Sequence, residues 1–345
     1  MTMPLVTAPV GVRAANLHDP READRLDAFV RDHGGTPFHL SGWSRAVERG
    51  CGQRARTLVA ERADGSLAGM LPLTEMRSAL FGRALVSTGF GVGGGVLGDT
   101  VEPLASGAWE LAQRLGCPSV ELRGGPAPDG WSVDDTTYLG FVRDLADDPL
   151  AAIPRKQRAE VRRSLTLDLE VAVGRDTAAL GEHYRVYAES VRNLGTPVFP
   201  RQLFSSIVND LDADVLTIRH QGKAVASVLS LYHAGTVYPY WGGGTAAARG
   251  LRANDRMYLA LMEHARARGM TRFDFGRSKA GTGPAAFKKN WGFAPEPLAY
   301  ARRSDGPARE VNPLSPKYRL MVAGWKRLPL PVATALGPLL SRGLG

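Results

Sequence analysis

The sequence predicts an α/β (α+β) protein made of two tandem units, each a mixed β-sheet flanked by helices. Two observations lead to this prediction. The chain has 345 residues, more than one typical domain needs. In addition, one order of patterns (hairpin, strand, glycine-rich loop, helix, strand) occurs twice, and its landmarks recur about 150 residues later, as Gly65 and Gly222, Gly93 and Gly242, and Gly116 and Gly269 do.

The first unit begins with two helical patterns, over residues 21–31 and from about Ser41. Two alternating segments follow and are joined at Asp64-Gly65, a dipeptide typical of hairpin turns. A later helix carries apolar residues at helical spacing and ends at Gly116. The predicted strands are Thr57–Glu61, Leu67–Leu73, Ala84–Thr88 and Ser119–Leu122, and a glycine-rich loop runs from Gly89 to Gly98.

The second unit repeats this order. A hairpin turns at Gln221-Gly222, and a strand enters three consecutive glycines, Gly242 to Gly244, which we expect to form a loop. A helix from about Asn254 follows and ends at Gly269. The predicted strands are Val215–Arg219, Ala224–Leu231, Thr236–Trp241 and Thr271–Phe275.

This order of elements is that of the GNAT (acyl-CoA N-acyltransferase) fold. In that fold the loop before the central helix offers backbone N–H groups to a phosphate, beside a splay between two strands. We therefore predict two tandem GNAT-like domains and one extension. They are residues 1–150, residues 151–310 beginning with a basic linker helix, and a proline-rich apolar extension at residues 311–345.

Composition narrows the partners and the compartment. The net charge of +9 favours an anionic partner such as a nucleotide-linked sugar, RNA or a membrane surface, although basicity also serves solubility. Cys51 and Cys117 lack metal-ligand spacing and fit a reducing compartment, so no metal is expected. Neither a signal-peptide pattern nor a run of about 18 apolar residues occurs. We expect a cytoplasmic protein.

The richest candidate site lies between Phe273 and Phe293. Arg277, Ser278 and Lys279 stand just past the end of a predicted strand, where open α/β sheets bind ligands. Cations at this place indicate an anionic or carbonyl-bearing substrate, and Phe287 and Trp291 add apolar surface. A solvated turn is the alternative.

A second basic element follows the first unit. Arg155, Arg158 and Arg162 share one helical face, which favours binding of phosphates of a nucleotide or an RNA backbone. An exposed linker helix, paired with acidic neighbours such as Asp147 and Glu160, is the alternative.

Two further patterns are weaker. Residues 249–253 stand where a GNAT diphosphate loop would lie but lack its later glycines, which weakens a coenzyme A site there. Tyr238 and Tyr240 share one face of a strand and line a polar cleft or lie in the core.

Four segments of the chain resemble the FemAB family, in particular the FemAB-related proteins of the XrtA/PEP-CTERM exopolysaccharide system. They are residues 153–163, 190–200, 274–293 and 325–331, so the resemblance spans nearly the whole chain. FemAB proteins are tandem GNAT-fold transferases, which agrees with the repeat. Their best-known members use aminoacyl-tRNA to add amino acids to peptidoglycan precursors in the cytoplasm.

The resemblance implies roles for individual residues. Lys288 matches a lysine beside the reacting ester carbonyl and would stabilise the oxyanion. Tyr238 and Tyr240 match tyrosines that line the second-domain channel. Trp43 and Arg45 lie in a Gly-Trp-Ser-Arg segment similar to one that contacts the precursor's diphosphate. At Phe199 precursor-binding relatives carry arginine, which puts the nucleotide-sugar peptide substrate in doubt.

Together these patterns predict an N-acyl- or aminoacyltransferase acting on an amine of a cell-envelope or exopolysaccharide precursor. We expect Lys288 to stabilise the developing charge, Arg277 and Lys279 to steer anions, and Asp274 or Tyr240 to assist proton transfer. Aminoacyl-tRNA and acyl-CoA stay open as donor co-substrates, and no tightly bound cofactor and no DNA partner are expected.

The alternatives are a GNAT N-acetyltransferase of polysaccharide biosynthesis and a non-catalytic scaffold at the membrane surface. The scaffold hypothesis comes from Leu328–Leu340, an apolar segment flanked by basic residues. Peripheral contact with the inner face of the membrane is therefore a further expectation. Three prolines in the segment argue against one continuous helix.

Overall fold

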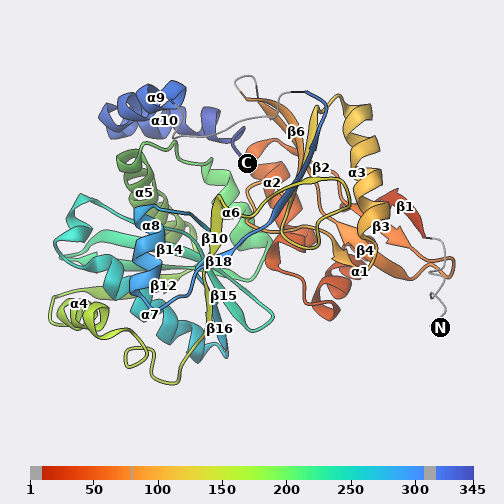
Figure 1. The fold of residues 1–345 in the computed structure, drawn as a ribbon. Helices are drawn as coiled ribbons and strands as arrows, with labels where there is room; N and C mark the ends of the chain where they lie inside the picture. The colour runs from red at the N-terminus through yellow and green to blue at the C-terminus, as the bar shows by residue number, and fades with distance from the viewer. Residues whose placement is uncertain (1–9, 79–80, 307–315) are drawn as a thin grey trace.

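The structure of the chain, a computed structural model, describes residues 10–78, 81–306 and 316–345, with only the backbone described at 316–320. Two six-stranded mixed sheets dominate, and helices cover them (Figure 1). The predicted α/β class is confirmed.

The first of these, called here the N-terminal sheet, combines one parallel pair of strands with antiparallel neighbours. Its strands, in spatial order, are β2 (Arg54–Ala55), β5 (Thr74–Ser78), β6 (Gly82–Ser87), β8 (Ser119–Arg123), β19 (Tyr300–Ser304) and β9 (Ser132–Asp134). β6 and β8 are parallel, and helix α3 (Val101–Leu115) crosses over between them. α3 ends at Gly116 in the left-handed conformation, as predicted.

A separate four-stranded sheet contains the predicted hairpin at Gly65. Its strands are β1 (Gly11–Ala14), β3 (Leu58–Glu61), β4 (Leu67–Leu71) and β7 (Leu97–Gly98).

The C-terminal sheet also combines one parallel pair of strands with antiparallel neighbours, but it includes the two strands that the hairpin at Gly222 joins. Its strands, in spatial order, are β11 (Val142–Asp144), β16 (Arg272–Asp274), β15 (Thr236–Gly244), β14 (Lys223–His233), β13 (Ala213–His220) and β12 (Glu170–Gly174). β15 and β16 are parallel, with α7 (Ala253–Ala267) as the crossover. They pair only through Val237–Phe273 and the pair before it, and then splay apart.

Side chains of a strand point alternately to the two faces of the sheet, so both faces of the C-terminal sheet carry apolar residues. Helices cover both faces. On β14, Leu229 packs with residues of α5 (Thr177–Leu194), whereas Val228 packs with residues of α7. The remaining helices are α1 (Pro20–Asp32), α2 (Ser41–Cys51), α4 (Arg155–Leu165), α6 (Arg201–Asp210), α8 (Gly283–Asn290), α9 (Pro316–Arg327) and α10 (Leu330–Ser341).

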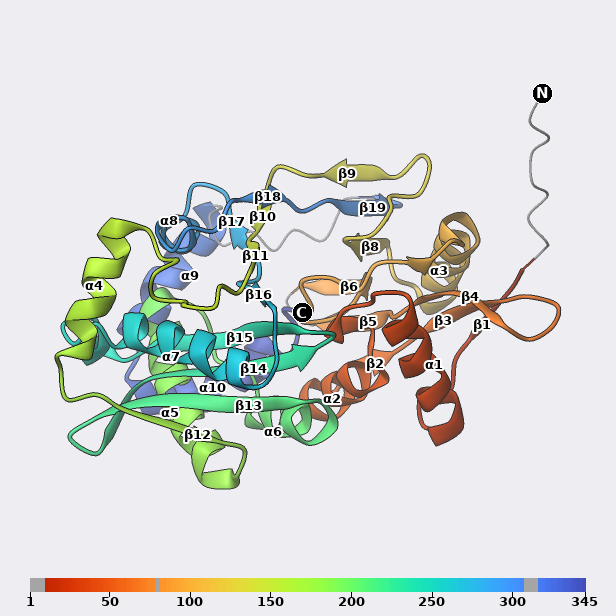
Figure 2. The ribbon, with the colours of Figure 1, turned by 90° about the horizontal axis from the view of Figure 1, so that it is seen from below.

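The two sheets exchange strands. β19, from the C-terminal part of the chain, pairs with β8 and β9 of the N-terminal sheet, while β11 pairs with β16. A small sheet of β17 (Ser278–Lys279), β10 (Tyr138–Gly140) and β18 (Glu296–Pro297) lies between them (Figure 2). Hydrogen-bonded strands therefore cross the predicted boundary at residue 150 in both directions.

The buried core is divided, as two units require, but one cluster is shared. One cluster lies under α3 and another under α7, whereas a third joins Trp43 and Val47 of α2 to Leu203 and Phe204 of α6. A Cβ at Gly50 would come within 2.5 Å of the Leu203 Cα, so the glycine allows α2 and α6 to pack closely.

Two local predictions are wrong. The prolines of the C-terminal segment do not prevent a continuous helix, because Pro331 stands in the first turn of α10 and the helix continues through Pro338. Gly242 to Gly244 do not form a loop but continue β15, paired with Val228, Ser227 and Ala226 of β14. The glycines are needed for close packing rather than for a turn, because a Cβ at Gly243 would collide with the Ser190 side chain of α5.

Candidate functional site

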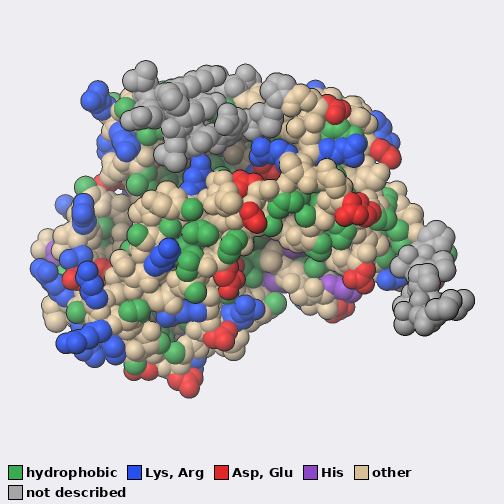
Figure 3. Space-filling view, viewed as in Figure 1, with side chains coloured by type: hydrophobic (Ala, Val, Ile, Leu, Met, Phe, Trp, Pro, Cys, Tyr) green, Lys and Arg blue, Asp and Glu red, His purple; other side chains and the backbone are tan. Residues whose placement is uncertain are grey.

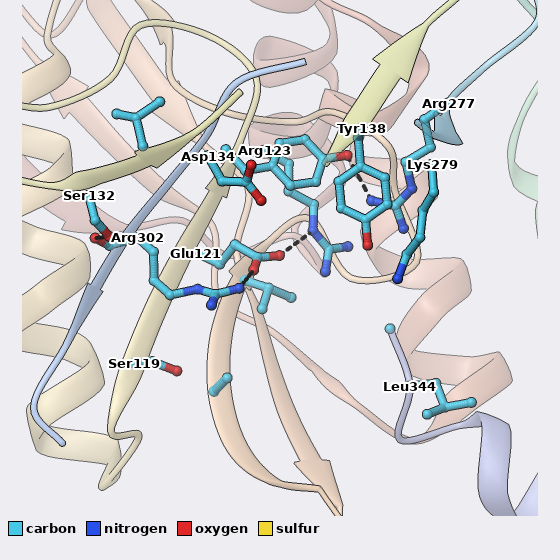
Figure 4. A pocket seen from close by; sticks show the side chains of 15 residues that line it. Ser119, Glu121, Arg123, Ser132, Asp134, Tyr138, Arg277, Lys279, Arg302 and Leu344 are labelled. Carbon is cyan, nitrogen blue, oxygen red and sulfur yellow. Dashed lines mark hydrogen bonds and ion pairs between the residues drawn. The ribbon is translucent and has the colours of Figure 1, made fainter. Parts of the chain in front are cut away.

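A pocket of about 390 Å³ opens on the face of the N-terminal sheet that α3 does not cover. Alternation along the strands brings polar residues of β8 and β19 to this face, while Leu122 and Ala301 lie in the core below α3. Side chains of both halves of the chain line it, and Figure 4 shows Tyr138 beside Arg277 and Lys279, with Glu121 and Arg302 further along the pocket. The polar lining residues are Ser119, Glu121, Arg123, Ser132, Asp134, Tyr138, Arg277, Lys279, Tyr300 and Arg302.

A row of charges crosses the floor of the pocket. Glu121 accepts from Arg123 Nε at 2.9 Å and from Arg302 on its other oxygen. Burial opposes ionisation of Glu121, but the two guanidinium groups outweigh it and lower its pKa to about 2. With Arg277, Lys279 and Asp134 added, the lining has four basic and two acidic side chains, and the pocket is net cationic.

Arg277 is the cation that the surrounding aromatic groups hold in place. Its Nη1 donates to the Tyr300 hydroxyl at 2.7 Å, and its guanidinium lies 4.6 Å from the centre of the Tyr138 ring. Lys279, two residues further along the chain, lies 5.8 Å from the same ring. Burial and the neighbouring Arg277 lower the pKa of Lys279. Arg277 and Lys279 thus line one pocket (Figure 4), and their binding of an anion stays a prediction.

The glycine-rich loop after β6, taken here as residues 88–95, does not line the pocket but bonds to residues that do, and hydrogen bonds from both halves fix it. Tyr240 of β15 donates to the Phe90 carbonyl at 2.5 Å, and Tyr300 donates to the Val92 carbonyl at 2.8 Å. Arg123 donates to the carbonyls of Thr88 and Gly91. Four of the loop's N–H groups bond within the protein, at residues 88, 89, 91 and 95. Those groups are not available to a phosphate.

Lys288, on α8, is 9% exposed and does not line the pocket. Its Nζ donates to the carbonyls of Gly276 and Arg277, both at 3.0 Å. Burial lowers its pKa to about 8, against the opposing effect of Asp274. In this geometry the ammonium holds the loop that presents Arg277, and the oxyanion role stays a prediction.

Asp274 stands at the start of the same loop. Its carboxylate accepts from the Gly276 N–H at 2.8 Å, and burial raises its pKa. A raised pKa suits proton transfer. The role of Asp274 in this step stays a prediction.

Three predicted substrate contacts lie away from the pocket. Trp43 is fully buried, and its indole N–H donates to the Gly89 carbonyl, so it is a core residue. Arg45 donates to Leu17 and Ser41 near α1. Phe199 packs edge-on against Phe90, at the tip of the glycine-rich loop. The sequence pattern did not reveal that the shared core covers α2.

The remaining aromatic candidates are also mainly structural. Tyr238 and Tyr240 share a face as predicted, and both rings lie against Phe38. Phe287 and Trp291 pack together around Tyr258 in the core under α7. The buried Ser278 belongs to β17, beside Tyr138 and Leu139 of β10.

The basic face of α4 is separate from the pocket. Lys and Arg gather over α4 in Figure 3. Within the part of the chain that the structure describes, Arg155, Arg158 and Arg162 have no hydrogen-bonded or ionic side-chain partner, while Glu160 pairs with Arg252 and Asp147 with Arg266. The acidic neighbours therefore do not neutralise this face.

The N-terminal end of α7, where a GNAT fold would hold a diphosphate, is lined with carboxylates. Glu189 accepts from the Ala246 N–H at 2.8 Å, and Glu160 of α4 pairs with Arg252 at 2.8 Å. Asp255 lies in the first turn of the helix. These groups oppose a second anion at this place.

Several pocket residues escaped sequence reasoning: Glu121, Arg123, Asp134, Tyr138, Tyr300 and Arg302. Their signal was polar residues at alternate strand positions. This alternation could be interpreted as a pocket lining only once the pairing of β19 with β8 was known. Among the described residues, no group of three or more metal-ligating side chains lies together, and no helix is both long and apolar enough to cross a bilayer.

The chain was compared with known proteins. Residues 154–289 match the family described as acetyltransferase (GNAT) domain. A search of curated proteins gave no significant match.

Solved structures match over most of the chain. FemX covers 84% of this chain, with 96% of its own length, at 15% identity and a TM-score of 0.65. The structure of L-PGS from Bacillus licheniformis covers 92%, with 99% of its own length, at 14% identity and a TM-score of 0.56.

A tandem GNAT protein from the clavulanic acid biosynthesis pathway covers 87%, with 100% of its own length, at 15% identity and a TM-score of 0.56. At such identities the likeness shows the fold. The chain therefore has a tandem GNAT-like fold, and its match over residues 154–289 supports the acyltransferase class of enzyme.

Proposed function

We propose that this chain transfers an activated acyl or aminoacyl group to an amine of an anionic cell-envelope or exopolysaccharide precursor. The observation that carries the proposal is the cationic pocket between the two halves, where Arg277 and Lys279 face the Arg302–Glu121–Arg123 row. A phosphate or carboxylate of the acceptor fits this charge.

The transfer needs the protein to bind the acceptor's anion, to keep the binding residues oriented and to accept a proton. The acceptor's neutral amine attacks the activated carbonyl carbon, a C–N bond forms, the bond to the donor's sulfur or oxygen breaks, and the amine loses a proton. Arg277 and Lys279 hold the acceptor's anion, and Lys288 fixes the loop carbonyls so that Arg277 keeps its direction. Asp274 is the proposed proton acceptor.

The donor has two candidates. The GNAT domain match implies an acyl-CoA-type donor. The carboxylates at the N-terminal end of α7 oppose a diphosphate there, whereas the unpaired arginines of α4 suit the phosphates of aminoacyl-tRNA. A salt titration separates the two, because binding through many phosphates weakens steeply as salt rises.

The test is a radiolabel transfer assay. Labelled acetyl-CoA and labelled aminoacyl-tRNA are supplied separately, with amines that carry a phosphate or a carboxylate as acceptors. We expect transfer from one donor, and Arg277→Gln to reduce kcat/KM about 100-fold, as loss of a charged group aligned with substrate does.

The matched control is Arg114→Gln, an exposed arginine of α3 on the opposite side of the N-terminal sheet. It should keep full activity. Absence of transfer from both donors, or equal rates in the Arg277 and Arg114 variants, would rule the proposal out.

A non-catalytic scaffold at the membrane surface is the second candidate. It is favoured by the outward apolar face of α10, with Leu336 and Leu339 exposed. Transfer activity in the assay above would eliminate the scaffold as the sole function, although it leaves membrane contact as a separate question.

A further inference from the structure

Helix α10 has two faces, but small side chains pack on the protein and large apolar side chains face outward. Its small residues Ala333, Gly337 and Ser341 recur every four positions and face the protein. Ser341 donates to the Val198 carbonyl at 2.8 Å, and a Cβ at Gly337 would come within 2.8 Å of the Val198 side chain. A helix that only covers a core would bury its large side chains instead.

The large side chains of α10 face outward. Val332, Leu336 and Leu339 follow one another at i, i+4 and i+7 and are 42%, 44% and 60% exposed. They form one continuous stripe along the helix.

Two elements that pack with α10 or beside it also carry an exposed large apolar side chain. Met321 of α9 is 53% exposed, and Leu194, at the end of α5, is 64% exposed. α9 and α10 both pack on α5 (Figure 1). A Cβ at Gly195, next to Leu194, would come within 2.5 Å of the Val322 side chain of α9. We call these five exposed residues, Leu194, Met321, Val332, Leu336 and Leu339, the apolar face.

The charge around the apolar face has one sign. From residue 321 to 345 the chain has no Asp or Glu but carries Lys326, Arg327 and Arg342. All three are exposed, and none forms an ion pair with another described residue. Basic residues beside exposed leucines are typical of helices that lie on an anionic bilayer.

We propose that the apolar face binds the surface of an anionic lipid bilayer, with α10 lying in the interface. The leucines enter the acyl boundary, and Lys326, Arg327 and Arg342 contact lipid phosphates. This inference concerns binding and does not depend on the proposed chemistry.

The fold links this surface to the pocket. Gln53, near the N-terminal sheet, donates to the Arg342 carbonyl at 2.7 Å, and Leu344 lines the pocket (Figure 4). Docking through α10 would therefore hold the pocket close to the headgroups, where an acceptor carried on a lipid is found.

The test is flotation of the full chain with vesicles of phosphatidylcholine, with or without phosphatidylglycerol. We expect binding to the anionic vesicles and its decrease as salt rises. Leu336→Ser with Leu339→Ser, and separately Lys326→Gln with Arg327→Gln, should each weaken binding about tenfold or more. Thermal unfolding of each variant checks that the exposed positions leave the fold intact.

Matched controls lie elsewhere on the surface. Leu165 and Val173 are 45% and 46% exposed, so Leu165→Ser with Val173→Ser removes similar apolar surface and should leave binding unchanged. Arg162→Gln with Arg163→Gln removes two charges from α4 and should also bind normally.

Three results would overturn the inference. The wild-type chain fails to float with anionic vesicles, or the α4 variant loses binding while the α10 variants keep it. Alternatively, gel filtration shows a dimer that the Leu336 and Leu339 changes dissociate, which would mean that a second copy covers the apolar face.

Discussion

Two loops lie at the seam, the region where the N-terminal and C-terminal halves of the chain meet. Different kinds of hydrogen-bonding group hold them in place. The glycine-rich loop at residues 88–95 is fixed mainly by uncharged aromatic donors, since Trp43, Tyr240 and Tyr300 all bond its carbonyls. The loop at residues 276–279 is held mainly by charged groups, since the Lys288 ammonium bonds two of its carbonyls and the Asp274 carboxylate accepts from the Gly276 N–H.

This difference separates scaffold from site. Aromatic donors do not ionise near neutral pH and also fill the shared core, so the first loop forms a rigid wall. The second loop depends on a titratable group and presents Arg277 and Lys279 to the pocket. Changes at the first loop should therefore alter stability, whereas changes at the second should alter activity and pH dependence.

The largest expected effect is at the buried anchor of the first loop. Trp43→Ala should lower the free energy of unfolding by about 3–5 kcal/mol, because a fully buried indole leaves a cavity between Phe38 and Trp241. Urea denaturation measures the loss. A change below about 1 kcal/mol would contradict the idea that the seam is part of the core.

A smaller effect isolates the hydrogen bond from the packing. Trp43→Phe removes the bond to the Gly89 carbonyl, whereas Trp291, equally buried, has no described partner for its indole N–H. We expect Trp43→Phe to cost about 1 kcal/mol more than Trp291→Phe. Equal losses in parallel denaturation curves would show that the bond contributes nothing.

Tyr240→Phe tests the clamp between the two halves, that is, the hydrogen bond from the Tyr240 hydroxyl to the Phe90 carbonyl. The hydroxyl bonds the Phe90 carbonyl across the seam, so its removal should cost about 1 kcal/mol and leave a buried carbonyl without that donor. Limited proteolysis of the 88–95 loop should accelerate in this variant. Unchanged cleavage together with unchanged stability would argue against the clamp.

The last effect concerns Lys288 and the pH dependence of stability. Burial lowers its pKa from the ordinary 10.5 to about 8, so between these values the unfolded chain binds more protons than the folded chain. The stability that this group contributes should therefore rise with pH across that window. The difference in unfolding free energy between wild type and Lys288→Met measures it, and a difference that stays flat from pH 8 to 10.5 would be inconsistent with a buried ammonium.

Local patterns in the sequence were enough to predict the landmark elements of the two repeats and the order of those elements. The hairpin at Gly65, the end of α3 at Gly116 and the crossover helix α7 follow from periodicity and from glycine conformations, which depend on near neighbours. The placement of Arg277 and Lys279 past the end of β16 followed from the same reasoning.

Long-range pairing decided the rest. β19 returns to the N-terminal sheet and sets Arg302 beside Glu121, some 180 residues earlier in the chain, and no local pattern encodes that neighbour. Burial of Trp43 likewise depends on α6 and β15 covering α2. The reversed amphipathicity of α10 could be recognised only once its small residues were found against Val198, because periodicity gives a helix two faces but does not say which one meets the protein.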